Sequence, residues 1–363
     1  MPHIEYLASE LLIQIFDHVG QVQDVLNLGA TCHRLHDVQT SSRQLYFLQD
    51  AAERQYGPLD DAFQLLTQND SQEAHIQRPI KVSLALLKQV VHVGRVAETW
   101  ADTYPFKKWK DDYTNRRLLS LDERFKVRRA IYRLWLYTRA FHTPSHPRES
   151  RLYPSAMRAR SALLHIWPTD ELAEIADVRG VIRDILASNV CPSNGAVTRK
   201  FVNRHGDDAA RQLVFNLTNI HLTFPPPAPP CPPNTGHFAQ PPKSELFEHS
   251  PTFRASTTRT KALHLGRYGG LDAGNEGWGD SMGHYYVVED MLKLDPERIL
   301  WLKERKMGRA QVVEYIRGLG DWFENYGDTW GETLEYVLAE RGEFVEDVMD
   351  EGGIVGYTGE DED

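Results

Sequence analysis

A serine flanked by glycines comes closest to a catalytic motif in this sequence. Residues 279–283, Gly-Asp-Ser-Met-Gly, match the Gly-x-Ser-x-Gly pattern in which Ser281 would be the nucleophile. That chemistry needs a strained strand-to-helix turn, followed later in the chain by an acid and a histidine. Here the preceding residues are glycines and polar side chains, and His284 is the last histidine. We interpret the segment as a glycine-rich turn, keep a hydrolase only as a third hypothesis, and expect that the chain is not an enzyme.

Groups that could bind a metal or form disulfides are scattered along the chain. The three cysteines are far apart and include no Cys-x-x-Cys pair, so neither a disulfide framework nor a cysteine zinc site is indicated. Histidines and aspartates of the glycine-rich region match no metal-site spacing, and we interpret them as solvated loop residues. We therefore expect no metal and no cofactor, and a reducing compartment, cytoplasm or nucleus. The residues concerned are Cys32, Cys191, Cys231, His264, Asp272, Asp280 and His284.

Composition and charge are those of a globular chain. No run of 18 apolar residues occurs, and the N-terminus lacks the basic start of a signal peptide, so we expect no membrane association. The net charge of −10 is uneven: residues 81–204 hold 23 Lys/Arg against 12 Asp/Glu, and residues 284–363 hold 8 against 21. This asymmetry either marks a basic surface for an acidic partner or reflects differently solvated helix faces, and we favour the second interpretation.

The first 50 residues carry apolar side chains at helical spacing. Ser9 is placed to cap a helix that Gly20 would end, and Asp24 is placed to cap a second helix. A third apolar stretch ends at residues 45–48. A segment this short rarely closes a core alone, so its apolar faces must meet the rest of the chain or another protein. The apolar positions of the first helix are Leu11, Leu12, Ile15, Phe16 and Val19.

The order and spelling of these motifs resemble an F-box. Residues 7–16, Leu-Ala-Ser-Glu-Leu-Leu-Ile-Gln-Ile-Phe, are similar to its opening, and residues 24–35, Asp-Val-Leu-Asn-Leu-Gly-Ala-Thr-Cys-His-Arg-Leu, to its second half. The match covers about 50 of the 363 residues. Ala8 replaces the usual proline, and Leu35 replaces a common tryptophan, as it often does in fungal members of the family.

The resemblance implies an adaptor of a cullin-RING ubiquitin ligase. Residues 4–48 would bind a Skp1-like protein, and through it a cullin, and the rest would present an unknown protein substrate. The alternative is a protein that binds Skp1 outside a ligase, or a structural interaction protein. The Skp1 contacts implied by the motif are Leu7, Leu11, Leu12, Ile15, Phe16, Leu26, Leu28, Cys32 and Leu35.

Residues 51–222 are predicted to be an α-helical domain. One helix is indicated by Leu84, Leu87 and Val91, another by the spacing of Val127, Ile131, Leu134 and Trp135, and a third follows Pro168 over residues 170–186. Stretches at 120–137 and 190–195 resemble segments of uncharacterised fungal F-box proteins. Arginines on the second helix suggest nucleic acid or a solvated face; we favour a solvated face and expect no nucleic acid. These arginines are Arg124, Arg128, Arg129 and Arg133.

The predicted fold is therefore mainly α: an N-terminal three-helix F-box in residues 1–50, followed by the helical domain. Repeated prolines make residues 223–245 a linker or strap, either a spacer or a ligand of an SH3 or WW domain, and we favour the spacer. Residues 246–355 are expected to be mostly helical with a glycine-rich loop at 266–283. Residues 356–363 form an acidic tail.

Overall fold

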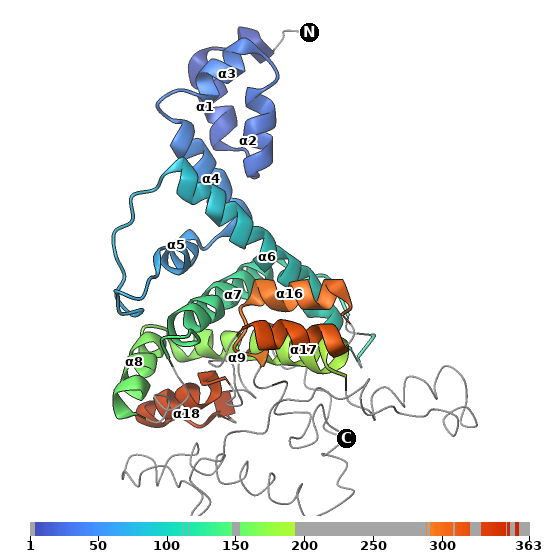
Figure 1. Ribbon diagram of the computed structural model, residues 1–363. Helices are drawn as coiled ribbons and strands as arrows, with labels where there is room; N and C mark the ends of the chain where they lie inside the picture. Colours follow the sequence, from blue (N-terminus) through green and yellow to red (C-terminus); the bar gives the residue numbers. More distant parts are fainter. Residues whose placement is uncertain are drawn as a thin grey trace, which may run out of the picture. The chain divides into compact units, whose positions relative to one another are not determined.

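The computed structural model is helical, and no strand occurs among the residues that it describes (Figure 1). This confirms the predicted mainly α fold. The chain divides into two compact units, Met1–Leu136 and Tyr137–Asp363, whose boundary falls within one helix, α7. The described residues are 4–110, 112–114, 116–146, 153–192, 288, 291–307, 309–319, 328–345, 347–348 and 353–355.

Several predicted features lie outside the described residues. They are the proline-rich linker, the glycine-rich loop with its Gly-x-Ser-x-Gly motif, and the acidic tail. The same holds for the stretch at 193–195, for Cys231, and for the histidines and aspartates considered as metal ligands, His264, Asp272, Asp280 and His284.

The N-terminal helices are short, and their caps differ from the prediction. Ser9 is the first residue of its helix rather than the cap, because Ala8 holds the extended N-cap conformation (φ −61°, ψ 148°) and no side chain caps the helix. Asp24 lies in the first turn of the next helix, whose N-cap is Gln21. The first helix ends before Gly20 is reached. The elements are η1 (Ile4–Tyr6), α1 (Ser9–Asp17), α2 (Val22–Gly29) and α3 (His33–Gln39).

Three further helices form the base on which these N-terminal helices pack. Helix α4 (Gln44–Tyr56) contacts α1, α2 and α3, and it also packs along α6 (Leu84–Lys108), which α5 (Leu59–Thr67) contacts as well. The boundary predicted at residue 50 falls inside α4. The predicted helix through Leu84 is confirmed, and Ser83 caps it by accepting a hydrogen bond from the backbone N–H of Leu86 at 3.2 Å.

A glycine allows the close approach of α6 to α4. A Cβ atom added at Gly94 would lie 2.5 Å from the ring of Tyr56, a buried residue near the end of α4. We expect Gly94→Ala to lower the free energy of unfolding by about 1–3 kcal/mol, because the added methyl group overpacks this contact. Urea unfolding followed by circular dichroism measures the effect. Gly180→Ala is the matched control, since a Cβ there would meet nothing within 4 Å.

The four arginines predicted on one face of α7 (Leu121–Phe141) lie within unit 1, and three of them form ion pairs with other helices. The predicted solvated face is therefore wrong: Arg128 and Arg133 are buried. Arg128 donates to the Gly57 carbonyl at 2.9 Å and pairs with Glu98 at 2.5 Å, and Arg133 pairs with Asp61 at 2.9 Å. Arg124 pairs with Glu98 and also with Asp102 at 2.8 Å. These contacts join α7 to α5 and α6.

A reciprocal cap starts α7. The Ser120 N–H donates to the Glu123 carboxylate at 2.7 Å, and the Glu123 N–H donates to Ser120 Oγ at 3.2 Å. Arg117 also pairs with Glu123 at 2.5 Å. The hydrogen bond from Arg117, followed by those from Ser120, lowers the pKa of Glu123 from 4.5 to about 2, against the opposing effect of burial. The ionised carboxylate of Glu123 therefore stabilises the folded state.

The cap predicts a stability change in acid. A depressed carboxyl pKa contributes stability above about pH 4.5, and this contribution is lost as the pH falls through about 2. Because Arg117 is half exposed and the pair is screened, Glu123→Gln should lower the free energy of unfolding at pH 7 by about 1 kcal/mol. Denaturant unfolding from pH 7 to pH 2 should also show a weaker acid dependence. Asp122→Asn is the exposed control, and equal effects of the two substitutions would contradict the role of the cap.

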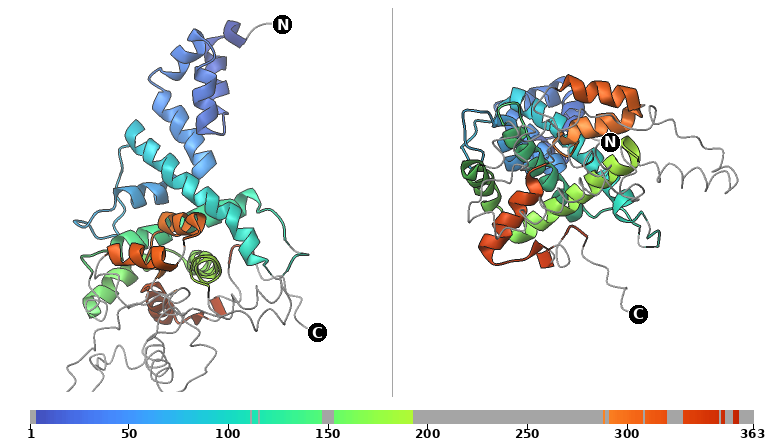
Figure 2. Two further views of the ribbon diagram at one scale, coloured as in Figure 1. Left: turned by 45° about the vertical axis from the view of Figure 1, so that its right-hand side comes forward. Right: turned by 60° about the horizontal axis from the view of Figure 1, so that its bottom comes forward.

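The second unit contains two groups of helices. Helix α8 (Pro154–His165) packs against α18 (Trp330–Arg341) (Figures 1 and 2). Helix α9 (Thr169–Ile185), which confirms the helix predicted after Pro168, continues into a π-helical turn at Leu186–Val190. Against this turn packs α16 (Pro296–Arg305). Trp301 of α16 lies 5.2 Å from the ring of Tyr315 in α17 (Arg309–Gly318).

A buried polar cluster joins α18 to its neighbours in this unit. The Tyr137 hydroxyl lies 2.8 Å from Thr329 Oγ1 and 2.9 Å from Thr333 Oγ1, and Arg160 donates to Thr333 Oγ1 at 3.1 Å. Burial raises the pKa of Tyr137 to about 12 and lowers the pKa of Arg160. Since these groups hydrogen-bond to one another, we assign the cluster a structural role.

Candidate functional site

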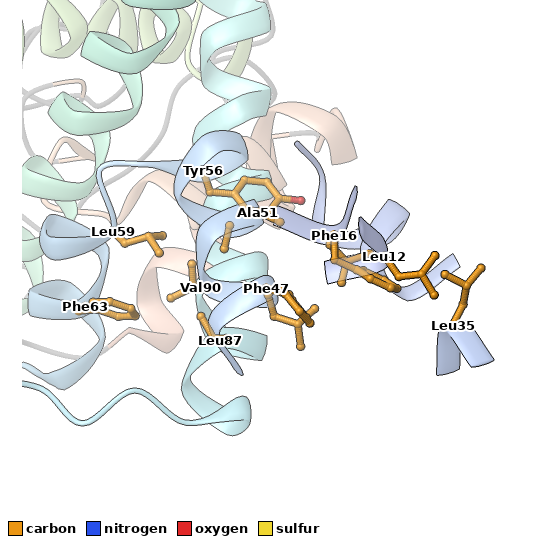
Figure 3. Packing of buried hydrophobic residues seen from close by; sticks show 13 residues of the cluster. Leu12, Phe16, Leu35, Phe47, Ala51, Tyr56, Leu59, Phe63, Leu87 and Val90 are labelled. Carbon is orange, nitrogen blue, oxygen red and sulfur yellow. The ribbon is translucent and has the colours of Figure 1, made fainter. Parts of the chain in front are cut away.

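The nine residues implied as Skp1 contacts fall into three groups by burial. Leu12, Phe16 and Leu35 are at most 1% exposed and belong to the core of the first unit. Figure 3 shows their side chains along the same cluster as Phe47 of α4. The rings of Phe16 and Phe47 stack with their centres 5.3 Å apart. These three residues therefore hold the short helices on α4.

The second group is partly buried at the margin of that core. Its members pack against the core while keeping some surface exposed. Each contributes to the packing of the short helices. The residues are Leu7, Ile15, Leu28 and Cys32.

The third group remains open to solvent. Leu11 is 45% exposed and Leu26 is 43% exposed. Two residues that the motif did not point to, Ile4 and Tyr6, are 44% and 73% exposed just ahead of α1. In the sequence, these two residues could have been noticed as an apolar pair that precedes the first helix and does not fit its helical spacing. We call these four residues the N-terminal apolar edge: Ile4, Tyr6, Leu11 and Leu26.

Hydrogen bonds fix the backbone around the N-terminal apolar edge. Arg34 of α3 donates to the Leu7 carbonyl at 2.6 Å, which ties the segment before α1 to α3. The Val22 N–H at the start of α2 donates to Gln55 Oε1 of α4 at 3.0 Å. Side chains on rigid elements lose less conformational entropy when a partner binds. The edge is therefore presented on an ordered framework.

The backbone at Ala8, where the F-box motif has a proline, is compatible with a proline ring. Its φ of −61° lies within the range that a proline ring imposes. Within the described part of the chain its amide donates no hydrogen bond that a proline would remove. The substitution thus changes one exposed side chain and not the entry into α1.

The polar side chains near the N-terminal apolar edge offer no reactive arrangement. Glu10, Asp24 and Asp37 are exposed, as are His33 and His36. Nowhere in the described ranges do three His, Cys, Asp or Glu residues gather closely enough to hold a metal ion. No described helix has the length and apolar character needed to cross a membrane.

Comparison with protein-family models, curated proteins and solved structures finds no match to this chain.

Proposed function

We propose that the chain is a non-catalytic adaptor that binds a Skp1-like protein through its N-terminal helices and a target protein through the rest. The motifs of residues 7–16 and 24–35 support this proposal. The observation that carries it is the exposure of Leu11 and Leu26, at 45% and 43%, on helices whose other apolar residues are buried or partly buried. Exposed apolar side chains held by ordered helices are available to a protein partner.

The burial pattern refines the implied contacts. In this proposal the N-terminal apolar edge contacts the partner directly, and the partly buried residues extend that contact. Leu12, Phe16 and Leu35 act indirectly, by fixing α1 and α3 on α4. The chain itself would carry out no reaction; it would bring a target lysine close to a ubiquitin-loaded enzyme. The cytoplasm or the nucleus is the compartment that fits this role.

The proposal predicts that the two exposed leucines carry the partner contact. Leu11→Glu with Leu26→Glu should reduce co-purification of co-expressed Skp1 by at least about tenfold, because two charges would be buried against an apolar surface. Both side chains point to solvent, so the thermal unfolding midpoint should stay nearly unchanged. A pull-down from cells that express both proteins measures the retained Skp1.

A matched control separates this contact from general surface effects. Leu84→Glu places the same charge on an equally exposed leucine, at 49%, at the start of α6, and it should bind Skp1 normally. If the double variant binds Skp1 as well as the unaltered protein does, the proposed contact through Leu11 and Leu26 is wrong. Recovery of Skp1 without a cullin would favour the alternative, a Skp1-binding protein outside a ligase.

A further inference from the structure

The connection between α5 and α6 contains a stretch of extended chain in the first unit. Residues 77–83, Gln-Arg-Pro-Ile-Lys-Val-Ser, form no helix or turn and lead to the start of α6 (Figures 1 and 2). Pro79 disfavours a helical conformation at the residue before it, and the β-branched side chains of Ile80 and Val82 favour an extended one. Ser83 has the dihedral angles of a strand, φ −135° and ψ 161°. We call residues 77–83 the α5–α6 segment.

One face of the α5–α6 segment is held on the core of the first unit. The side chains of Ile80 and Val82 are partly buried against that core, whereas Lys81 between them is exposed. This alternation is the one that a strand produces, because successive side chains point to opposite faces. At the end of the segment, Ser83 accepts the hydrogen bond from Leu86 that caps α6. The segment is therefore fixed in its second half, which lowers the entropy that it would lose on binding a partner.

The backbone of the α5–α6 segment keeps its hydrogen-bonding groups free for a partner. In the described part of the chain, the N–H groups and carbonyls of residues 77–82 take part in no hydrogen bond. In an extended chain, the N–H and carbonyl of every second residue point to the same edge. Pro79 removes a donor from the edge that it shares with Lys81, but the edge of residues 78, 80 and 82 keeps three donors and three acceptors. That edge is a template on which another strand can pair.

The charges of the α5–α6 segment indicate the character of the pairing strand. Arg78 and Lys81 are exposed, and neither forms an ion pair with a residue that the structure describes. Residues 74–97 include four Lys/Arg and no Asp or Glu. The carboxylates on either side of this range are already engaged, since Glu73 lies 3.4 Å from His75 and Glu98 pairs with two arginines of α7. Acidic side chains on the pairing strand would therefore complement this surface.

We propose that the α5–α6 segment binds an acidic polypeptide segment in extended conformation, which adds to it as a β-strand through main-chain hydrogen bonds. The edge of residues 78, 80 and 82 supplies those bonds, and Arg78 and Lys81 attract the acidic side chains. Alternating donors and acceptors match a polypeptide backbone better than a row of phosphates, which only accept hydrogen bonds. Residues 77–83 span about 23 Å, the length of an ordinary strand. The inference goes beyond the adaptor proposal and does not depend on it.

The test begins with a random library of short peptides displayed on phage and selected on the immobilised full-length protein. The enriched sequences should combine Asp or Glu with the β-branched residues Val, Ile and Thr. A fluorescein-labelled synthetic copy of the most enriched sequence is the probe for anisotropy titrations. Two further copies carry N-methyl groups on every second amide, in the two alternate registers. Because only one edge of the bound strand faces the protein, one N-methylated copy should bind at least about tenfold more weakly than the probe, and the other should bind like the probe.

Variants of the protein test the contribution of the charges. Arg78→Glu with Lys81→Glu should weaken probe binding at least about tenfold, and most strongly at low salt. The matched control is Lys88→Glu with Arg95→Glu, which makes the same change of charge at two exposed residues of α6. It should weaken probe binding by less than about threefold, because screening reduces the effect of charges outside the contact. Both double variants should keep the thermal unfolding midpoint of the unaltered protein, since all four side chains are exposed.

The remaining outcomes separate this inference from its alternatives. Leu11→Glu with Leu26→Glu should bind the probe like the unaltered protein, so a failure of the adaptor proposal is seen separately. Equal affinities of the two N-methylated copies, unchanged binding by the variant at Arg78 and Lys81, or no enrichment of acidic sequences would overturn the inference. Tighter binding of a single-stranded DNA oligonucleotide than of the probe, lost in the same variant, would overturn it as well, because it would assign the α5–α6 segment to a nucleic acid.

Discussion

Phe16→Ala should lower the free energy of unfolding by about 3–5 kcal/mol, whereas Leu11→Ala should change it by less than about 0.5 kcal/mol. Both residues belong to the apolar motif of α1, yet Phe16 is 1% exposed and stacks on Phe47, while Leu11 is 45% exposed. Truncation at Phe16 leaves a cavity among core side chains. Truncation at Leu11 removes surface that water already reaches.

Urea unfolding followed by circular dichroism measures both changes. If the chain is the adaptor proposed above, the two substitutions should have the opposite order of effect on Skp1 binding, measured at a temperature where both variants are folded. Leu11→Ala should then weaken binding directly, and Phe16→Ala should act only through the fraction of folded protein. Equal losses of stability would mean that α1 is not packed on α4 as described.

The different positions of these residues on α1 explain why the sequence could not separate them. At about 100° per residue, Leu11, Ile15, Leu12 and Phe16 follow one another around about 140° of α1. Such a stripe is wider than the strip of one neighbouring helix, so one margin stays exposed. Nothing in the spacing says which margin faces α4. In the structure Phe16 stacks on Phe47 and is buried, whereas Leu11 stays exposed.

Helix positions were easier to predict than the partners of the polar groups. The apolar spacing around Leu84 and Val127 and the proline at 168 were sufficient to predict α6, α7 and α9. By contrast, Arg128 binds Glu98 and Gly57, which are 30 and 71 residues away in the sequence. Periodicity contains no information on such distant pairs. The Ser-x-x-Glu cap at residues 120–123, by contrast, is a local pattern that the sequence itself displays.

Loss of a single carboxylate should reveal how far the first unit depends on those distant pairs. Glu98 of α6 pairs with Arg128, whose side chain is 8% exposed, and with Arg124, which also contacts Asp102. We expect Glu98→Ala to lower the free energy of unfolding by about 3 kcal/mol, because it leaves the Arg128 guanidinium buried without its carboxylate. This is the low end of the range for buried pairs, since the Glu98 side chain keeps 24% exposure.

The double variant Glu98→Ala with Arg128→Met distinguishes two contributions to stability. One is the destabilisation caused by a buried, unpaired guanidinium, and the other is the net stabilisation by the ion pair. The double variant removes both charges and keeps an apolar side chain of similar length, so it should be more stable than Glu98→Ala alone by about 1–2 kcal/mol. Denaturant unfolding of the four proteins of this cycle gives the coupling energy. Asp102→Ala, whose side chain is 68% exposed, is the surface control and should cost less than about 1 kcal/mol. A double variant no more stable than Glu98→Ala would mean that Arg128 contributes mainly through its bond to the Gly57 carbonyl, which fixes the turn between α4 and α5.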